Sequence, residues 1–180
     1  MAKLVLGNLF AGNVGELAFE RLAYNHGIAY LGLEEVHKDL CENQLTFKCG
    51  CYRIPLEIEK ELIPEIKRIS TPGGKHNSMF IFDYLAASLA GFKRGKGGVY
   101  LPGRPRGLSD LNLVEVKFGG GRLSEQQKEA MAKTPISVSV IRVKLPRGKL
   151  LGAVDIGPDE RYSKTEYFAN RKTLFDCLSS

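Results

Sequence analysis

The chain has 180 residues, 43% hydrophobic and 26% charged, a balance that predicts one globular domain with a sizeable core. No apolar run approaches the ~20 residues needed to cross a bilayer. The N-terminal stretch "MAKLVLGNLFAGNVGE" lacks the unbroken apolar region of a signal peptide. We therefore expect an intracellular protein with no membrane partner, located in the cytoplasm, or in a host cell if its source is a virus.

Helical and strand-like patterns alternate in the first half of the chain. "NVGELAFERLAYNHG" predicts a helix that Asn13 would cap and Gly27 would end. "IAYLGLEEV" is strand-like, and "QLTFKCGCYRIPLEI" predicts two strands that meet at Gly50. "EKELIPEIKRI" has helical spacing, which Pro64 would kink or limit to short turns. "MFIFDYLAAS" is a β-prone run that holds Asp83.

The second half begins with "GFKRGKGGVYLPGRPRG", residues 91–107, whose glycines and prolines predict a loop or a loose hairpin. "LNLVEVKFG" is the next strand, and "SEQQKEAMAK" predicts a helix with a capping box of Ser124 and Gln127, ended by Pro135. "ISVSVIRVKL" is a last, alternating strand. The order of helix, strand, extra material, strand, strand, helix and strand predicts an α/β domain with a mixed sheet flanked by helices.

A carboxylate and a lysine lie two residues apart in the strand "LNLVEVKFG". Side chains two apart on a strand share a face, so Glu115 and Lys117 should point the same way. Val114 and Val116 should then pack on the opposite face. A charged pair inside an apolar strand is costly unless it is solvated or has a function.

The same alternation places Asp83 and Ile81 on one face of "MFIFDYLAAS". The other face of that run would carry the aromatic side chains Phe80, Phe82 and Tyr84. If the two strands are neighbours, Asp83 converges with Glu115 and Lys117 on a single site. Two carboxylates and a backbone carbonyl suit a hard cation such as Mg²⁺, and a lysine beside it can orient a water or neutralise charge on a phosphate.

The segment "LVEVKFGGGRLSEQQKEAM" resembles the core motif of the PD-(D/E)xK nuclease superfamily, with Glu115-Val116-Lys117 as the (D/E)xK element. "RLSEQQ" is similar to the segment after that motif in archaeal Holliday-junction resolvases and virus-type replication-repair nucleases. The resemblance implies a restriction-endonuclease-like αβββαβ core with a mixed central sheet flanked by helices. The nuclease domain would span residues 1–150, with an insertion around 36–75, and a C-terminal extension would span 151–180.

The resemblance also implies a Mg²⁺ site, which Mn²⁺ can occupy. The implied metal ligands are Asp83, Glu115 and the carbonyl of Val116. The implied catalytic residues are Lys117, Glu115, Asp83, Glu16 in the first helix and Gln127 in the helix after the motif. The aspartate departs from the family pattern. In that pattern the aspartate lies about ten to twenty residues before the motif and usually follows a proline directly. Asp83 follows Phe82 and lies further upstream, whereas Asp110 is nearer but has the opposite parity to Glu115.

The distribution of charge favours DNA as the partner. The net charge is +6, but residues 1–90 hold 9 Lys/Arg against 11 Asp/Glu, a net of −2, and residues 91–180 hold 17 against 9, a net of +8. The segment 91–107 has five basic and no acidic residues, the composition of an arm that contacts phosphates. The nucleic-acid-binding candidates are Lys93, Arg94, Lys96, Arg104, Arg106 and Arg122. The expected partner is duplex or branched DNA, and the resemblance makes a homodimer reasonable.

Each feature also has a structural interpretation without function. Glu115 and Lys117 can form a solvent-exposed cross-strand pair, Gln127 can merely complete its helix cap, and Asp83 can be satisfied by a buried hydrogen bond. Glu16 can be an ordinary helix-surface residue. The hypothesis is a Mg²⁺-dependent DNA endonuclease, with resolvase-like selectivity for branched DNA as one version. The alternatives are an exonuclease or general DNA-processing nuclease, and a non-catalytic DNA-binding protein on a nuclease-like core.

Overall fold

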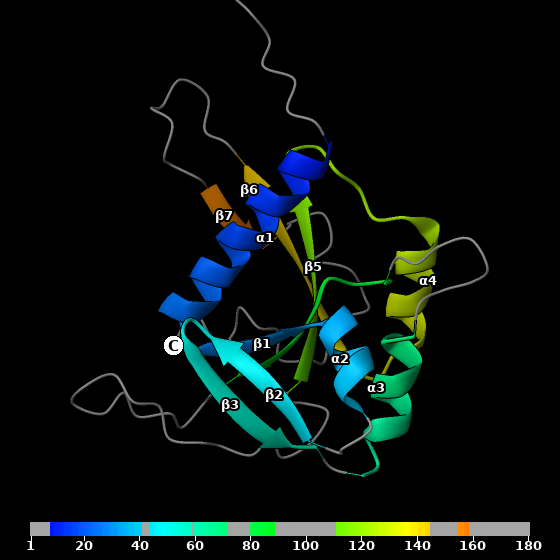
Figure 1. Cartoon of the computed structure of the whole chain (residues 1–180). Helices are drawn as coiled ribbons and strands as arrows, with labels where there is room; N and C mark the ends of the chain where they lie inside the picture. Colours follow the sequence, from blue (N-terminus) through cyan, green and yellow to red (C-terminus); the bar gives the residue numbers. More distant parts are fainter. Residues whose placement is uncertain are drawn as a thin grey trace, which may run out of the picture.

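The computed structural model describes residues 8–40, 44–58, 60–71, 80–88, 111–144 and 155–158 (Figure 1). In chain order the elements are α1 (Asn8–Asn25), β1 (Ile28–Gly32), α2 (Leu33–Asp39), β2 (Gln44–Cys49), β3 (Tyr52–Glu57), α3 (Ile63–Ile69), β4 (Tyr84–Ser88), β5 (Leu111–Phe118), α4 (Glu125–Lys133), β6 (Ser137–Lys144) and β7 (Asp155–Pro158). None of these helices combines the length and the apolarity that crossing a membrane requires.

The strands form one mixed sheet in the order β3-β2-β1-β4-β5-β6-β7. Neighbouring strands are antiparallel except for β5 and β6, which are parallel. A parallel pair needs a crossover connection, and α4 provides it. Helix α1 lies on one side of the sheet, and α2, α3 and α4 lie on the other (Figure 1). The predicted α/β fold with a mixed sheet flanked by helices is confirmed.

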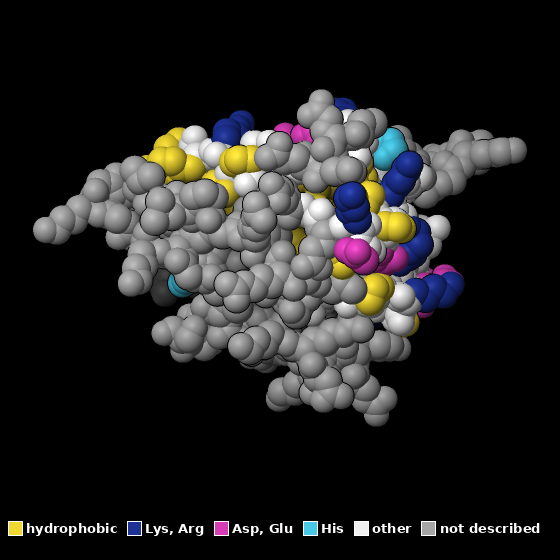
Figure 2. All heavy atoms as spheres, turned by 90° about the horizontal axis from the view of Figure 1, so that it is seen from below, with side chains coloured by type: hydrophobic (Ala, Val, Ile, Leu, Met, Phe, Trp, Pro, Cys, Tyr) yellow, Lys and Arg dark blue, Asp and Glu magenta, His cyan; other side chains and the backbone are white. Residues whose placement is uncertain are grey.

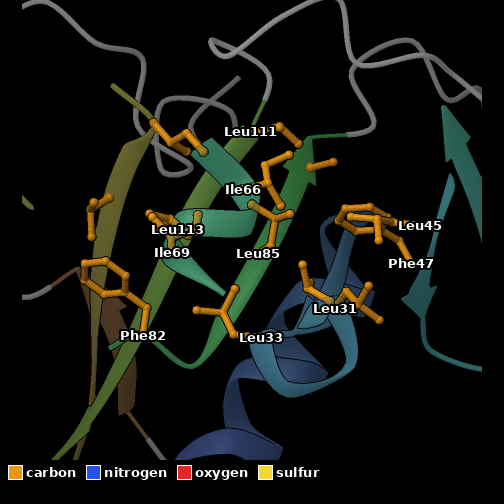
Figure 3. Close-up of a cluster of buried hydrophobic side chains, with 14 of the residues drawn as sticks. Leu31, Leu33, Leu45, Phe47, Ile66, Ile69, Phe82, Leu85, Leu111 and Leu113 are labelled. Atoms are coloured by element: carbon orange, nitrogen blue, oxygen red, sulfur yellow. The ribbon is translucent and has the colours of Figure 1, made fainter. Parts of the chain in front are cut away.

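Both faces of the central strands are buried, so the sheet separates two apolar cores. The smaller core joins Phe19 and Ala23 of α1 to alternate residues of the strands, Val114 among them. The larger core holds the intervening strand residues, such as Leu113, and the apolar sides of α2 and α3 (Figure 3). Ala130 and Met131 of α4 also belong to it. This alternation follows from the two-residue period of a strand. It confirms that Val114 and Val116 face away from Glu115 and Lys117.

Two predicted helix and strand boundaries were wrong. Helix α1 begins at Asn8 rather than at a cap on Asn13, although it ends as expected before Gly27. The predicted strand "IAYLGLEEV" covers a strand and a helix, because α2 begins at Leu33. Leu33 and Val36, three residues apart, both pack into the larger core, and two glutamates in the first turn suit the positive end of the helix dipole.

The run "MFIFDYLAAS" was also predicted to be extended throughout, and this was wrong. The strand begins at Tyr84, and residues 81–83 form a bend before it. Phe82 therefore joins the larger core while Tyr84 joins the α1 side, so the two do not share a face. The backbone of Asp83 explains the change, because its N–H donates to the Val114 carbonyl and its carbonyl accepts from the N–H of Leu33.

The hairpin β2–β3 was predicted in its correct place. Gly50 has a φ of 60°, and a Cβ added there would lie 2.4 Å from a ring carbon of Tyr24, so the turn requires glycine and packs against α1. Pro64 lies in the first turn of α3, a position that a proline tolerates. Most of the region predicted as an insertion, residues 36–75, builds this hairpin, α3 and most of α2. The basic segment 91–107 lies outside the described residues.

Candidate active site

The carboxylate of Glu115 is buried in the middle of the sheet. Glu115 on β5 is 3% exposed, and its Oε1 forms an ion pair with Nζ of Lys117 at 2.5 Å. The other oxygen, Oε2, is buried without a hydrogen-bond partner among the described residues. The interpretation of Glu115 and Lys117 as a solvent-exposed pair was therefore wrong. A half-satisfied carboxylate in a low-dielectric interior is costly and marks a position that needs a functional explanation.

Asp83 reaches the same position from the neighbouring chain segment. The antiparallel register pairs Tyr84 of β4 with Val114 of β5, which brings Asp83 beside Glu115. Its Oδ2 accepts a 2.7 Å hydrogen bond from the backbone N–H of Val116. The bend that ends the strand early therefore turns the Asp83 side chain onto β5. Two carboxylates from segments far apart in sequence meet beside one lysine.

Burial raises the pKa of both acids. Burial raises the pKa of Glu115 from 4.5 to about 7, and the charge of Asp83 adds to the effect, whereas Lys117 and the Gln127 side chain oppose it. Burial raises the pKa of Asp83 from 3.8 to about 6, where the Val116 N–H lowers it and the charge of Glu16 raises it further. Groups whose pKa is shifted by burial and by a like charge are typical of functional sites. Near neutral pH the site favours either a proton or a cation.

Gln127 connects the cap of α4 to this cluster. Its backbone N–H donates to Oγ of Ser124 and its Oε1 accepts from the Ser124 N–H, so the predicted capping box is confirmed. Its Nε2 donates a 2.9 Å bond to the carbonyl of Ile81, in the bend before β4. The amide also lowers the pKa of Glu115. Gln127 therefore caps α4 and also lies at the candidate site. The sequence analysis had treated these two roles as alternatives.

Glu16 approaches the cluster from the opposite side of the sheet. It is exposed on α1, and it lines a cavity of about 330 Å³ together with Asp83 and Tyr84. Partial burial of its carboxyl group raises the pKa of Glu16, and the charge of Glu20 one turn later raises it further. Helix α1 lies close to β5 because Gly15 leaves room, since a Cβ there would be 3.2 Å from Cγ1 of Val116. Glu16 is therefore close enough for its charge to raise the pKa of Asp83.

The donors around Glu115 suit a divalent cation with few protein ligands. The free oxygen Oε2 of Glu115 and the carboxylate of Asp83 are hard oxygen donors. On a strand the N–H and C=O of one residue point to the same edge, so the Val116 carbonyl faces the side on which its N–H binds Asp83. Among the described residues, no three His, Cys, Asp or Glu side chains form a group that could hold a metal. A cation here would keep several waters, as Mg²⁺ does.

Arg142 is a site component that the sequence reading missed. It is 6% exposed on β6, where the parallel register pairs it with Lys117. Its guanidinium donates to the carbonyls of Gly119 and, at 2.6 Å, of Gly121, in the turn after β5. A Cβ at Gly121 would lie 3.6 Å from Cδ of Lys117, so this turn lies against the lysine chain. The charge of Arg142 between the apolar residues Ile141 and Val143 of "ISVSVIRVKL" was the available signal.

The structure thus brings together Asp83, Glu115, Lys117 and Gln127, with Glu16 facing Asp83 across a cavity. Of the nucleic-acid-binding candidates, Arg122 is described and exposed. The other five, Lys93, Arg94, Lys96, Arg104 and Arg106, lie outside the described residues, as does Asp110. Comparisons of this chain with protein-family models, with curated proteins and with solved structures find no match.

Proposed function

We propose that the protein is a Mg²⁺-dependent deoxyribonuclease of the PD-(D/E)xK type. The observation that carries the proposal is the meeting of Asp83, Glu115 and Lys117, with one buried oxygen of Glu115 left without a partner. A divalent cation would stabilise the charged forms of these two buried carboxylates, whose pKa values are raised. The unpaired oxygen favours a cation site over a purely structural ion pair, which would be expected to satisfy both oxygens.

The order of the elements supports the same proposal. The elements α1, β1, β4, β5, α4 and β6 follow one another as αβββαβ, with β2, β3, α2 and α3 added after β1. Strands β1, β4 and β5 are antiparallel neighbours, and β6 joins β5 in parallel. This is the arrangement expected of a restriction-endonuclease-like core. Glu115 and Lys117 lie on its third strand, β5, and Asp83 lies in the bend just before its second strand, β4. Function is argued from the site, and the fold raises its plausibility.

The side chains of the site have distinct roles in the proposed hydrolysis. Asp83, Glu115 and the Val116 carbonyl would hold Mg²⁺, which polarises a phosphodiester oxygen. Lys117 would orient the attacking water and offset negative charge that develops on the phosphate. Water attacks the phosphorus and the P–O3′ bond breaks, which leaves a 5′-phosphate and a 3′-hydroxyl. Gln127 keeps the bend before β4 in place and limits the pKa of Glu115.

A cleavage assay with matched variants tests the proposal. Labelled four-way junctions, flaps, single strands and linear duplexes are incubated with Mg²⁺, Mn²⁺ or EDTA. Lys117→Met and Glu115→Gln should abolish metal-dependent cleavage and leave DNA retention largely intact. The matched controls are Lys128→Met and Glu125→Gln, because these residues form a 2.6 Å ion pair on the exposed surface of α4. Cleavage by Lys117→Met and Glu115→Gln at the wild-type rate would refute the proposal.

The same panel separates the remaining alternatives. An exonuclease releases nucleotides from ends and leaves closed circular DNA intact, whereas an endonuclease nicks it. A non-catalytic DNA-binding protein retains all substrates in a salt-sensitive manner and yields no products with either metal. The residue before Asp83, which is Phe82 and not the proline of the family pattern, is the observation that favours this last alternative. Selectivity for branched DNA and a homodimer that cuts two strands symmetrically stay predictions.

A further inference from the structure

A second cavity opens beside Lys117, on the side of the sheet that α3 and α4 cover. Its volume is about 520 Å³, within the range of small-molecule sites. It lies at the junction of the two helices, where Oγ1 of Thr134 after α4 donates to Glu65 of α3 at 2.8 Å. Lys117 and Gln127 of the candidate active site form part of its wall. Whatever enters this cavity therefore lies next to the proposed point of cleavage.

The charge of the wall predicts an anionic occupant. Four basic side chains line the cavity, Arg68, Lys117, Arg122 and Lys133, against one acid, Glu129. Lys133 and its partner Glu129 are both 64% exposed, and such a pair is weak in water and can exchange for a phosphate. Arg68 is 47% exposed and binds Glu65 with two guanidinium nitrogens, so it adds positive charge to the wall while it stays paired. Arg122 forms no ion pair within the described part of the chain. In Figure 2, basic side chains gather around acidic ones on the right, where Figure 1 places α3 and α4.

The uncharged residues of the wall suit a nucleobase. Phe80 is half-buried and offers an aromatic ring, the side chain on which unpaired bases stack. Gln126 is exposed at the start of α4, and its amide can donate and accept hydrogen bonds at a base edge. Phe80 also lines the cavity that Asp83 and Glu16 share. A base near Phe80 can therefore remain joined to a phosphate that lies between Asp83 and Lys117.

We infer that this cavity binds one unpaired nucleotide of the DNA strand next to the scissile phosphate. The inference rests on the proposed nuclease function and narrows its substrate class to DNA with an unpaired nucleotide at the cleavage point, as at a flap, a branch or a frayed end. A cavity of about 520 Å³ has room for a single nucleotide. A base in a regular duplex would have to unpair and unstack before it could enter, which costs free energy. An already unpaired base avoids this cost.

Binding in EDTA tests the inference without any need for cleavage. The probe is a duplex with a short single-stranded flap whose first unpaired base is 2-aminopurine, and the reference is the same sequence fully paired. The fluorescence of 2-aminopurine should fall on binding, because the base stacks on Phe80. Arg122→Ala should weaken binding of the flap by about tenfold and leave the duplex nearly unaffected. The matched control is Arg21→Ala, an arginine over Tyr24 on α1, away from this cavity.

The outcomes separate this inference from the proposed function. Fluorescence that falls with the flap, in a protein that never cleaves DNA, would support the cavity and refute the nuclease. Metal-dependent cleavage combined with equal affinity for flap and duplex, or with no effect of Arg122→Ala, would refute the cavity and leave the nuclease. Phe80→Leu should remove the fluorescence change, and its far-UV circular dichroism shows whether it folds. Because Arg122 is exposed, Arg122→Ala should fold normally, and its binding result tests the cavity even if Phe80→Leu does not fold.

Discussion

Replacing Glu115 by glutamine should stabilise the metal-free protein at alkaline pH. The folded protein binds the Glu115 proton more tightly than the unfolded chain, since burial and Asp83 raise its pKa from 4.5 to about 7. The stability that the protonated group contributes is therefore complete below pH 4.5 and is lost as the pH rises through about 7. One pKa unit corresponds to about 1.4 kcal/mol, so the charged form costs about 3 kcal/mol at pH 8. Glu115→Gln removes that charge and keeps the shape of the side chain.

Urea unfolding in EDTA measures this difference. The chain has no tryptophan, so far-UV circular dichroism is the suitable signal. At pH 8 we expect Glu115→Gln to unfold at a higher urea concentration than wild type, with a gain of about 1–3 kcal/mol, and at pH 4.5 the gain should largely vanish. Glu125→Gln, whose side chain is 89% exposed, is the control and should change stability by at most about 0.5 kcal/mol. A Glu115→Gln variant that is less stable than wild type at pH 8 would refute the reasoning.

The same experiment with Mg²⁺ should largely offset the stability advantage of Glu115→Gln. A cation that binds only the folded protein adds about 2.7 kcal/mol when its concentration is one hundred times its dissociation constant. Wild type should gain this increment at pH 8, and Glu115→Gln should gain almost none because it lacks one of the two carboxylates. Equal stabilisation of both proteins by Mg²⁺ would place the ion elsewhere.

Two further substitutions test how the site is supported. Arg142→Met should lower the free energy of unfolding by about 2–4 kcal/mol in the urea assay, since the carbonyls of Gly119 and Gly121 lose charge-assisted hydrogen bonds. An unchanged urea midpoint would show that these hydrogen bonds do not stabilise the turn. Ser124→Ala should cost about 1 kcal/mol through the lost cap of α4. It should also slow metal-dependent cleavage, because the Gln127 side chain loses its fixed position; a loss of stability with full activity would leave Gln127 as a cap alone.

The sequence predicted the elements around the site well and their ends less well. Alternation identified β5 and β6, and Ser124 marked the start of α4, since these signals depend on neighbouring residues. The end of the strand at Tyr84 depends on distant partners, because Val114 and Leu33 take up the backbone groups of Asp83. Strand propensity is read from neighbouring residues in the sequence, so it cannot predict hydrogen bonds to distant residues.

The same limit applies to the site. Glu115 and Lys117 could be placed on one face from their spacing alone, and their ion pair follows from it. The contact of Asp83 with Val116 depends on strand register across 33 residues, and the expected alternation of Phe82 and Tyr84 was wrong there. The burial of Glu115 and the role of Arg142 could not be predicted, because both depend on how helices cover the sheet.

The central claim is that Asp83 and Glu115 jointly bind a divalent cation, and a Mn²⁺ titration followed by electron paramagnetic resonance tests it directly. The signal of free Mn²⁺ should fall as wild-type protein is added at pH 7.5, and it should fall much less with Asp83→Asn or Glu115→Gln. Glu125→Gln should bind like wild type. Equal depletion of free Mn²⁺ by all four proteins, or by none of them, would contradict the claim.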